Sequence, residues 1–271
     1  MRFSLFCTIS VILVACGGSK PPVREAVVVP TVVAKPQINV STINVKFGDT
    51  DRYDWEDRRP WSYPIHGIDV SKFQGDIDWE SARQSGVNFA FIKATEGGDH
   101  LDEKFADNWQ AARDADVLRG AYHFYYFCRT ASEQAQWFIQ NVPKDAKALP
   151  PVLDMEWNHQ SRNCRYKPTP EKIRHEIRVY LGTVTAHYGK RPLIYVTPDF
   201  YDENKLSRIS GYEFWLRSVA NHPSQIYRGQ EWAFWQYTGT GEVPGIEGNV
   251  DLNTFSGSVP DWQAWAGQYT E

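Results

Sequence analysis

The amino-acid sequence predicts an α/β fold, a modified β/α barrel of the TIM type whose helical layer is incomplete in the C-terminal third. Between residues 65 and 197, short apolar runs alternate with longer amphipathic runs, as strands and helices do in such barrels. After residue 210, strand-like runs follow one another without a long helix. With 271 residues, of which 42% are hydrophobic, the chain is long enough for one large domain of this kind.

The first part of the predicted barrel contains five strands. Their apolar runs alternate with amphipathic segments, which favours parallel strands that are buried on both faces. The five strands are expected at residues 65–71, 87–95, 119–127, 148–156 and 191–197.

Amphipathic helices are expected between these strands. The clearest one covers residues 169–189, because Thr169 can cap its N-terminus, Pro170 suits the first turn, and Gly189 can end it. The other helices are expected at residues 78–86, 102–117 and 130–142.

The last third of the chain contains strands without long helices between them. These strands are expected at residues 212–220, 231–239 and 248–255. The barrel should therefore be regular in its first five units and abbreviated afterwards.

Residues 1–16 are expected to be a lipoprotein signal peptide. Arg2 precedes an apolar run that is too short to span a bilayer and that ends in small residues. The end of this run, "LVAC" followed by Gly17, resembles a bacterial lipobox, with Cys16 as the lipidated first residue of the mature chain. The alternative is an ordinary export signal that happens to contain a cysteine.

Residues 17–62 contain prolines, short valine runs and a charged cluster, but no helical period. This composition predicts an extended tether, whose last part, with Trp55 and Trp61, can fold back on the domain. Residues 63–271 are then the barrel domain.

Charge and cysteine content restrict the classes of partner. The formal net charge of −4 gives no electrostatic reason to expect nucleic acid or an anionic membrane surface as a partner. After loss of the signal, Cys128 and Cys164 remain as a pair that can form a disulfide in an oxidising compartment. No C-x-x-C or H-x-x-x-H spacing predicts a metal site, and no cofactor is expected.

Two carboxylates follow an apolar run in "ALPPVLDMEWN", residues 148–158. On an extended strand, Asp154 and Glu156 point to the same side, with Cα atoms roughly 6 to 7 Å apart. Two acids that close raise the pKa of at least one of them, which suits a pair that contains a proton donor and an ionised partner. The pattern alone also fits a solvated strand edge.

Two more acids are expected at the ends of other strands. Asp69 occurs in "GIDVS" and Asp251 in "NVDLN". In barrels of this class, catalytic groups gather at the carboxyl ends of the strands. The four acids are therefore predicted to converge on one rim and form a catalytic site.

At these residues the sequence closely resembles the glycoside hydrolase family 25 lysozymes, which are N-acetylmuramidases. The resemblance covers about residues 65 to 257. It rests on the ordered motifs "HGIDVSKFQGDIDW", "FAFIKATEGG", "RGAYHFY", "PPVLDMEWN", "PLIYVT" and "WAFWQYTGTGEVPGIEGNVDLNTF". It implies a modified barrel and hydrolysis of the β-1,4 bond after N-acetylmuramic acid in peptidoglycan.

The resemblance also implies roles for the acids. Glu156 matches the general acid, and Asp154 matches the carboxylate that orients the substrate's 2-acetamido group or stabilises positive charge. Asp69 and Asp251 match the acids that flank this pair. Both retention and inversion of the anomeric configuration stay open. A wide separation of the acids with a trapped water between them would favour inversion.

Several aromatic and amide side chains match positions in the cleft. By strand alternation, Tyr122 and Phe124 share one face. Tyr195 and Trp235 are expected to contact sugar rings, although either could be core, and Gln236 is expected to bind substrate. As a departure from the family pattern, "FWLRSVANHP" has valine near a position that is often aromatic.

Other readings of the sequence remain. The chain could be a peptidoglycan-binding lipoprotein without turnover, or a chitinase-like glycosidase that also uses a D-x-E pair. The expected location is the bacterial cell envelope. The lipobox and the non-acidic Gly17 favour a lipid anchor in the outer membrane, facing the periplasm.

Overall fold

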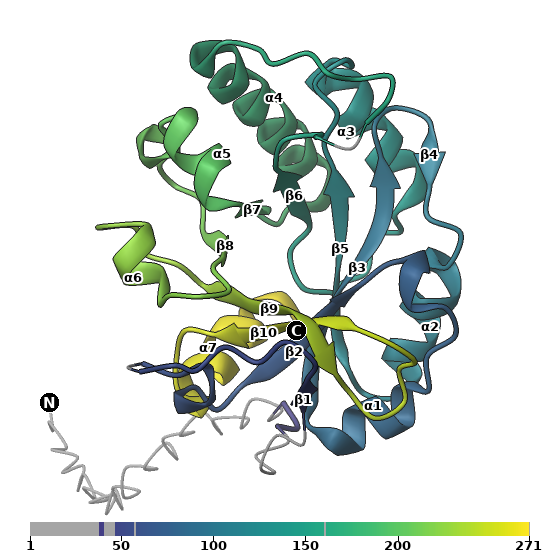
Figure 1. The fold of residues 1–271 in the computed structure, drawn as a ribbon. Helices are drawn as coiled ribbons and strands as arrows, with labels where there is room; N and C mark the ends of the chain where they lie inside the picture. The colour runs from purple at the N-terminus through teal and green to yellow at the C-terminus, as the bar shows by residue number, and fades with distance from the viewer. Residues whose placement is uncertain (1–37, 41–46, 57, 160, 271) are drawn as a thin grey trace, which may run out of the picture. The chain divides into compact units, whose positions relative to one another are not determined.

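The computed structural model describes residues 38–40, 47–56, 58–159 and 161–270. Eight strands close into a barrel, because β8 pairs with β9 and so joins the two sides of the sheet. Figure 1 shows the barrel with helices around part of it. The barrel strands are β2 (His66–Val70), β3 (Val87–Glu96), β5 (Leu118–Phe124), β6 (Val152–Met155), β7 (Leu193–Val196), β8 (Phe214–Arg217), β9 (Phe234–Glu242) and β10 (Val250–Phe255).

Strands β2 to β9 in this barrel run parallel to their neighbours, whereas β10 runs antiparallel to both β2 and β9. The predicted modified barrel is therefore confirmed. The last strand reverses because only residues 243–249 join it to β9, and a parallel strand would need a longer crossover connection.

Four helices cover the regular part of the barrel, as the sequence predicted. They are α1 (Trp79–Ser85), α2 (Phe105–Asp114), α3 (Ala131–Asn141) and α4 (Pro170–Tyr188). In α4, the Thr169 side chain accepts a hydrogen bond from the Lys172 amide, and Gly189 adopts a left-handed conformation after the last turn. The expected caps of this helix are confirmed.

The later connections contain only short helices before the chain ends in α7 (Val259–Thr270). Of the described helices, none is both long and apolar enough to cross a lipid bilayer. The remaining short elements are β1 (Gly48–Asp49), η1 (Pro60–Ser62), η2 (Lys72–Gln74), β4 (His100–Leu101), α5 (Pro198–Glu203), η3 (Leu206–Arg208) and α6 (Pro223–Ile226).

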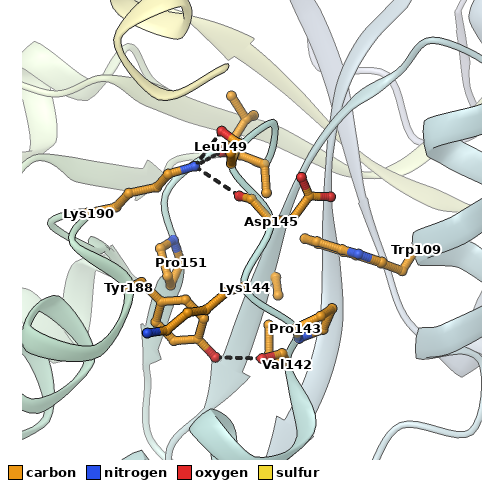
Figure 2. A pocket seen from close by; sticks show the side chains of 12 residues that line it. Trp109, Val142, Pro143, Lys144, Asp145, Leu149, Pro151, Tyr188 and Lys190 are labelled. Carbon is orange, nitrogen blue, oxygen red and sulfur yellow. Dashed lines mark hydrogen bonds between the residues drawn. The ribbon is translucent and has the colours of Figure 1, made fainter. Parts of the chain in front are cut away.

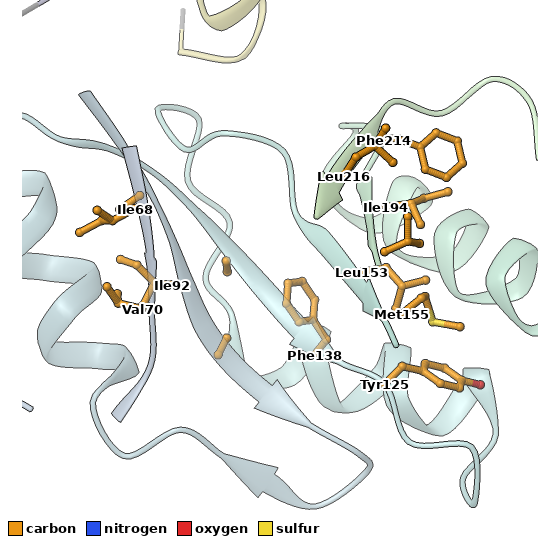
Figure 3. Close-up of a cluster of buried hydrophobic side chains, with 14 of the residues drawn as sticks. Ile68, Val70, Ile92, Tyr125, Phe138, Leu153, Met155, Ile194, Phe214 and Leu216 are labelled. Carbon is orange, nitrogen blue, oxygen red and sulfur yellow. The ribbon is translucent and has the colours of Figure 1, made fainter. Parts of the chain in front are cut away.

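Two hydrophobic cores follow from strand alternation. The outer core lies between the strands and the helices, and Figure 3 shows part of it, including Leu153, Met155 and Ile194. The inner core fills the barrel with side chains such as Phe91 and Trp215. Helix α7 contributes buried tryptophans to this inner core and closes the end of the barrel opposite to the strands' carboxyl ends.

One lysine side chain holds the loop before β6 in place. Lys190 Nζ donates hydrogen bonds to the carbonyl oxygens of Asp145, Ala146 and Ala148, and to that of Tyr269 in α7. Figure 2 shows this lysine beside a cavity of about 350 Å³. The hydrogen-bond donors of the Lys190 ammonium group are all used by carbonyl oxygens. We therefore interpret this cavity as a structural feature between the loop, the barrel and α7.

Part of the predicted tether packs on the barrel. Strand β1 pairs with β9, and the Trp55 ring is only 5% exposed and lies 5.1 Å from the Trp235 ring. Trp61 is 55% exposed. The fold-back that the sequence suggested therefore occurs through Trp55, and the packed part of the chain begins before residue 62. Cys16 and the rest of the predicted signal peptide lie outside the described residues.

Candidate active site

Four acidic side chains line one cavity at the rim of the barrel. Asp69 lies on β2, Asp154 near the end of β6, Glu156 directly after it, and Asp251 on β10. All four border a cavity of about 290 Å³. The structure therefore brings together the acids that the sequence predicted to converge.

The direction of one strand differs from the prediction. Asp251 was expected at the carboxyl end of a strand, but it lies near the start of β10. The prediction of its strand position is wrong because β10 runs antiparallel to its neighbours. The same reversal pairs Asp251 with Asp69 in the strand register, and so places it at the correct rim.

Strand alternation places both acids of the D-x-E pair on the same side of the strand, as expected. Asp154 and Glu156 border the cavity, whereas Met155 is buried in the outer core. The Cys128–Cys164 disulfide, which the sequence allowed, is present and ties the segment after β6 to the segment after β5. The chain that follows Glu156 is therefore anchored to the segment after β5.

Asp69 is held by two amide side chains. Its Oδ2 atom accepts hydrogen bonds from Gln236 Nε2 at 2.9 Å and Asn253 Nδ2 at 2.7 Å. Tyr195 donates its hydroxyl proton to Gln236 Oε1 at 2.8 Å, and Trp215 Nε1 donates to Asn253 Oδ1 at 2.7 Å. This network fixes the carboxylate and orients both amides.

Burial raises the pKa values of the four acids. It raises the pKa of Asp69 to about 6, against the two amide hydrogen bonds, which lower it. Burial and the nearby Asp69 charge raise the pKa of Asp251 to about 8. At neutral pH the cluster therefore holds protons that the same acids would lose in water.

The pKa values of the central pair, Asp154 and Glu156, are raised in the same way. Burial, followed by the charge of Glu156, raises the pKa of Asp154 well above its ordinary value. Burial also raises the pKa of Glu156, although the positive charge of Arg217 lowers it. Two neighbouring acids that resist full ionisation can carry one proton between them, as acid catalysis requires.

One oxygen of the pair has an unused hydrogen-bonding capacity. Asp154 Oδ1 is buried and accepts no hydrogen bond from any residue that the structure describes. A buried carboxylate oxygen without a donor is costly in its ionised form, which agrees with the raised pKa of Asp154.

Three of the predicted aromatic residues border the cavity. Tyr122, Phe124 and Tyr195 line it, and Gln236 lies beside them with its amide bonded to Asp69. Tyr122 and Phe124 share one face of β5, as alternation predicted. Their rings can contact the apolar faces of sugars.

Trp235 does not line this cavity, and its prediction as a ring contact is wrong. It is fully buried on the outer face of β9, where it packs against Trp55 and His222, and its Nε1 atom donates to the Ser218 carbonyl. Alternation on β9 turns Gln236 inward and therefore turns Trp235 outward. On the neighbouring strand, Trp215 occupies the inner position.

Several cavity residues were absent from the sequence prediction. They include Phe73, which is 81% exposed, and the cations Lys93 and Arg217. Alternation could have found Arg217, because it lies two residues after Trp215 on β8. Among the described residues, no group of His, Cys, Asp and Glu side chains is arranged to hold a metal ion.

Comparison with known proteins places the chain in a family. The sequence model of "Glycosyl hydrolases family 25" matches residues 68–246. Uncharacterized protein YegX of Escherichia coli K12 is 39% identical over 214 residues, 77% of this chain and 75% of the relative. Lysozyme M1 of Streptomyces globisporus is 35% identical over 206 residues, 72% of this chain and 69% of the relative.

A solved structure agrees with this assignment. The family 25 glycosyl hydrolase from Bacillus anthracis superposes with a TM-score of 0.72 at 36% sequence identity, covering 81% of this chain and 99% of that chain. The family model matches the part of the chain that carries Asp69, Asp154 and Glu156, and Asp251 lies just after the end of that match. The chain belongs to the glycosyl hydrolases of family 25, and its sequence and fold are those of a glycoside hydrolase.

Proposed function

We propose that the enzyme hydrolyses the β-1,4 bond between N-acetylmuramic acid and N-acetylglucosamine in peptidoglycan. The observation that carries the proposal is the cavity in which Asp154 and Glu156 lie side by side with two further acids. The similarity to lysozyme M1 of Streptomyces globisporus supports the choice of substrate. Tyr122 and Phe124 supply ring surfaces at the same cavity.

In the proposed reaction, Glu156 donates a proton to the glycosidic oxygen as the C1–O bond breaks. The carbonyl oxygen of the substrate's own 2-acetamido group attacks C1, so no nucleophile from the enzyme is needed. Asp154 accepts the acetamido N–H and stabilises the positive charge that develops on the ring and the amide. Asp154 borders the cavity beside Glu156, which suits this role.

A water molecule then opens the cyclic intermediate. Glu156, which is now ionised, takes a proton from that water as its oxygen bonds to C1, and the acetamido group is released. The enzyme returns to its starting protonation state. Asp69 adds negative charge beside the pair and so helps to keep a proton on Glu156, in agreement with the direction of its pKa. Asp251, whose pKa is raised to about 8, flanks the pair as a protonated acid at neutral pH.

The test is the identity of the new reducing ends. Purified peptidoglycan is digested with the enzyme, the products are reduced with borohydride, and the reduced sugars are identified by mass spectrometry. We expect reduced muramic acid. Reduced glucosamine would show a glucosaminidase or chitinase-like specificity, and the absence of new ends with retained binding would show a binding protein.

We infer that residues 1–16 direct export and that Cys16 receives lipid, which would anchor the enzyme in the outer membrane facing the periplasm. The lipobox-like "LVAC" supports this, and so does the Cys128–Cys164 disulfide, because such bonds persist in oxidising compartments. The signal peptide would be removed, and the residues before β1 would span the distance to the membrane.

Lipid attachment is tested by metabolic labelling with a clickable fatty acid and by fractionation of the membranes. We expect label on the wild-type chain and on Cys7→Ser, and no label on Cys16→Ser. Cys7→Ser is the matched control because it removes the other cysteine of the predicted signal. Equal labelling of Cys16→Ser would contradict the proposal.

A further inference from the structure

The active-site cavity contains two cations with different surroundings. Lys93 Nζ lies 2.5 Å from Glu96 Oε2 and 4.8 Å from the centre of the Phe124 ring. The guanidinium group of Arg217 forms no hydrogen bond or ion pair with the residues that the structure describes, although it borders the same cavity. Within this part of the chain, Arg217 is therefore the cavity cation without a fixed acidic partner.

The backbone of Arg217 is held firmly. The residue pairs with Gln236 across the β8–β9 ladder, and its carbonyl oxygen accepts a hydrogen bond from the Tyr227 hydroxyl at 2.7 Å. Its side chain is half-buried and faces the cavity on the same side of β8 as Trp215. A guanidinium on a rigid strand with its donors unused is prepared to bind a ligand.

The charges around Arg217 indicate the kind of ligand. Its positive charge lowers the pKa values of Asp69, Glu156 and Asp251, so its guanidinium lies within electrostatic reach of three of the four acids. An anionic substrate would be repelled from such a cavity unless a cation faced it. Arginine is also the side chain best shaped to hold a carboxylate through two parallel hydrogen bonds.

The proposed substrate carries such a group on only one of its two sugars. Muramic acid bears an O-lactyl substituent, which ends in a free carboxylate or, when a stem peptide is attached, in an amide followed by the carboxylates of the peptide. N-acetylglucosamine is neutral. We propose that Arg217 binds a carboxylate of the acidic substituent on muramic acid and so selects this sugar; the inference rests on the proposed function.

Three forms of the glycan distinguish the sources of the carboxylate. Strands freed of peptides by an amidase carry lactyl carboxylates, intact strands carry peptide carboxylates, and peptide-free strands coupled to methylamine with a carbodiimide are neutral. The value of kcat/KM is measured for the wild type, Arg217→Gln and Arg217→Lys on each form, at the pH optimum of each pair. Arg208→Gln, at an exposed arginine outside the cavity, is the matched control.

We expect Arg217→Gln to reduce kcat/KM on at least one carboxylate-bearing form by roughly tenfold or more beyond its effect on neutral strands, because the neutral strands report only the altered charge around the acids. Arg217→Lys should retain part of the activity because it keeps the charge. A loss confined to amidase-treated strands identifies the lactyl carboxylate, and a loss confined to intact strands identifies the stem peptide. Thermal unfolding of each variant verifies that the fold is retained.

An equal loss on all three forms would overturn the inference, because Arg217 would then act only on the protonation of the acids. No loss on any form would overturn it as well. Binding of each form to Glu156→Gln and to Glu156→Gln/Arg217→Gln is measured in parallel, so that the comparison does not depend on turnover. If the wild type cleaves no form of the strand, the proposed function fails, and the binding comparison still decides the role of Arg217.

Discussion

Asp251 shows how a single buried acid links activity to stability. Burial and the charge of Asp69 raise its pKa from an ordinary value of 3.8 to about 8. Between these two pH values the folded chain keeps a proton that the unfolded chain loses. The folded state is therefore favoured at the acidic end of this window, and its stability falls as the pH rises through it.

Asp251→Asn should remove this loss because asparagine does not ionise. We expect the free energy of unfolding at pH 8 to increase by about 1 to 3 kcal/mol relative to the wild type, with a smaller change at pH 4. Urea unfolding at both pH values measures the difference. Glu247→Gln, at an exposed acid in the connection before β10, should leave the pH dependence unchanged. Parallel pH profiles for the wild type and Asp251→Asn would contradict this account.

Strand alternation explains which site residues the sequence could predict. The pattern of Asp154, Met155 and Glu156 fixes two residues on one face, and the structure agrees. Alternation does not predict which face of a strand points into the barrel when both faces carry aromatic side chains. On β9 this choice made the prediction for Trp235 wrong, because the outer face is covered by Trp55 from a distant part of the chain.

At the scale of elements, the disulfide fixes the segment that follows the acid pair. Cys128 and Cys164 are separated by 36 residues and join the segments after β5 and β6. Closing a loop of this length restricts the unfolded chain and stabilises a protein by about 4 kcal/mol. Neither cysteine borders the cavity of the four acids.

Replacing both cysteines by serine should lower the free energy of unfolding by about 2 to 4 kcal/mol. Activity at 25 °C should stay within about twofold of the wild type, because the acids keep their positions on the barrel. Denaturant unfolding and peptidoglycan turnover test the two statements. Reductant should destabilise the wild type to a similar extent and leave the double variant unaffected; equal stability of the two proteins would argue against the assigned bond.

The elements that the sequence predicted correctly carry strong local signals. Helix α4 begins at Thr169 and ends before Gly189, because both residues satisfy backbone groups at its ends. The expected strand at 148–156 is shorter in the structure, since Pro150 and Pro151 cannot donate to a ladder. Helix α7 was not expected, although Trp262, Trp265 and Ala266 have the spacing of one helical face.

At the scale of the whole molecule, the barrel depends on contacts between distant parts of the chain. Strand β10 runs antiparallel to β2 and closes the barrel by pairing with it, and α7 covers the end of the barrel opposite to the four acids. The segment around Trp55 covers the outside of β9. These arrangements were not predictable from local pattern, because each depends on which surface is left uncovered by the rest of the fold.

The contribution of the N-terminal segment to stability can be measured in the full chain. Trp55→Ala should lower the free energy of unfolding by about 3 to 4 kcal/mol, because it removes a buried ring and leaves a cavity beside Trp235. Trp61→Ala is the matched control, since that ring is 55% exposed, and its effect should be within about 0.5 kcal/mol. Similar effects for the two variants would show that the segment does not pack as described.

In the proposed reaction, Glu156 protonates the leaving oxygen while Asp154 stabilises the positive charge beside it. The most direct measurement compares wild type, Glu156→Gln and Asp154→Asn on peptidoglycan and on an aryl glycoside whose phenolate leaves without a proton. We expect Glu156→Gln to lose about a thousandfold or more on peptidoglycan and far less on the aryl glycoside, and Asp154→Asn to lose activity on both. Equal losses for Glu156→Gln on the two substrates, or none, would contradict the assignment.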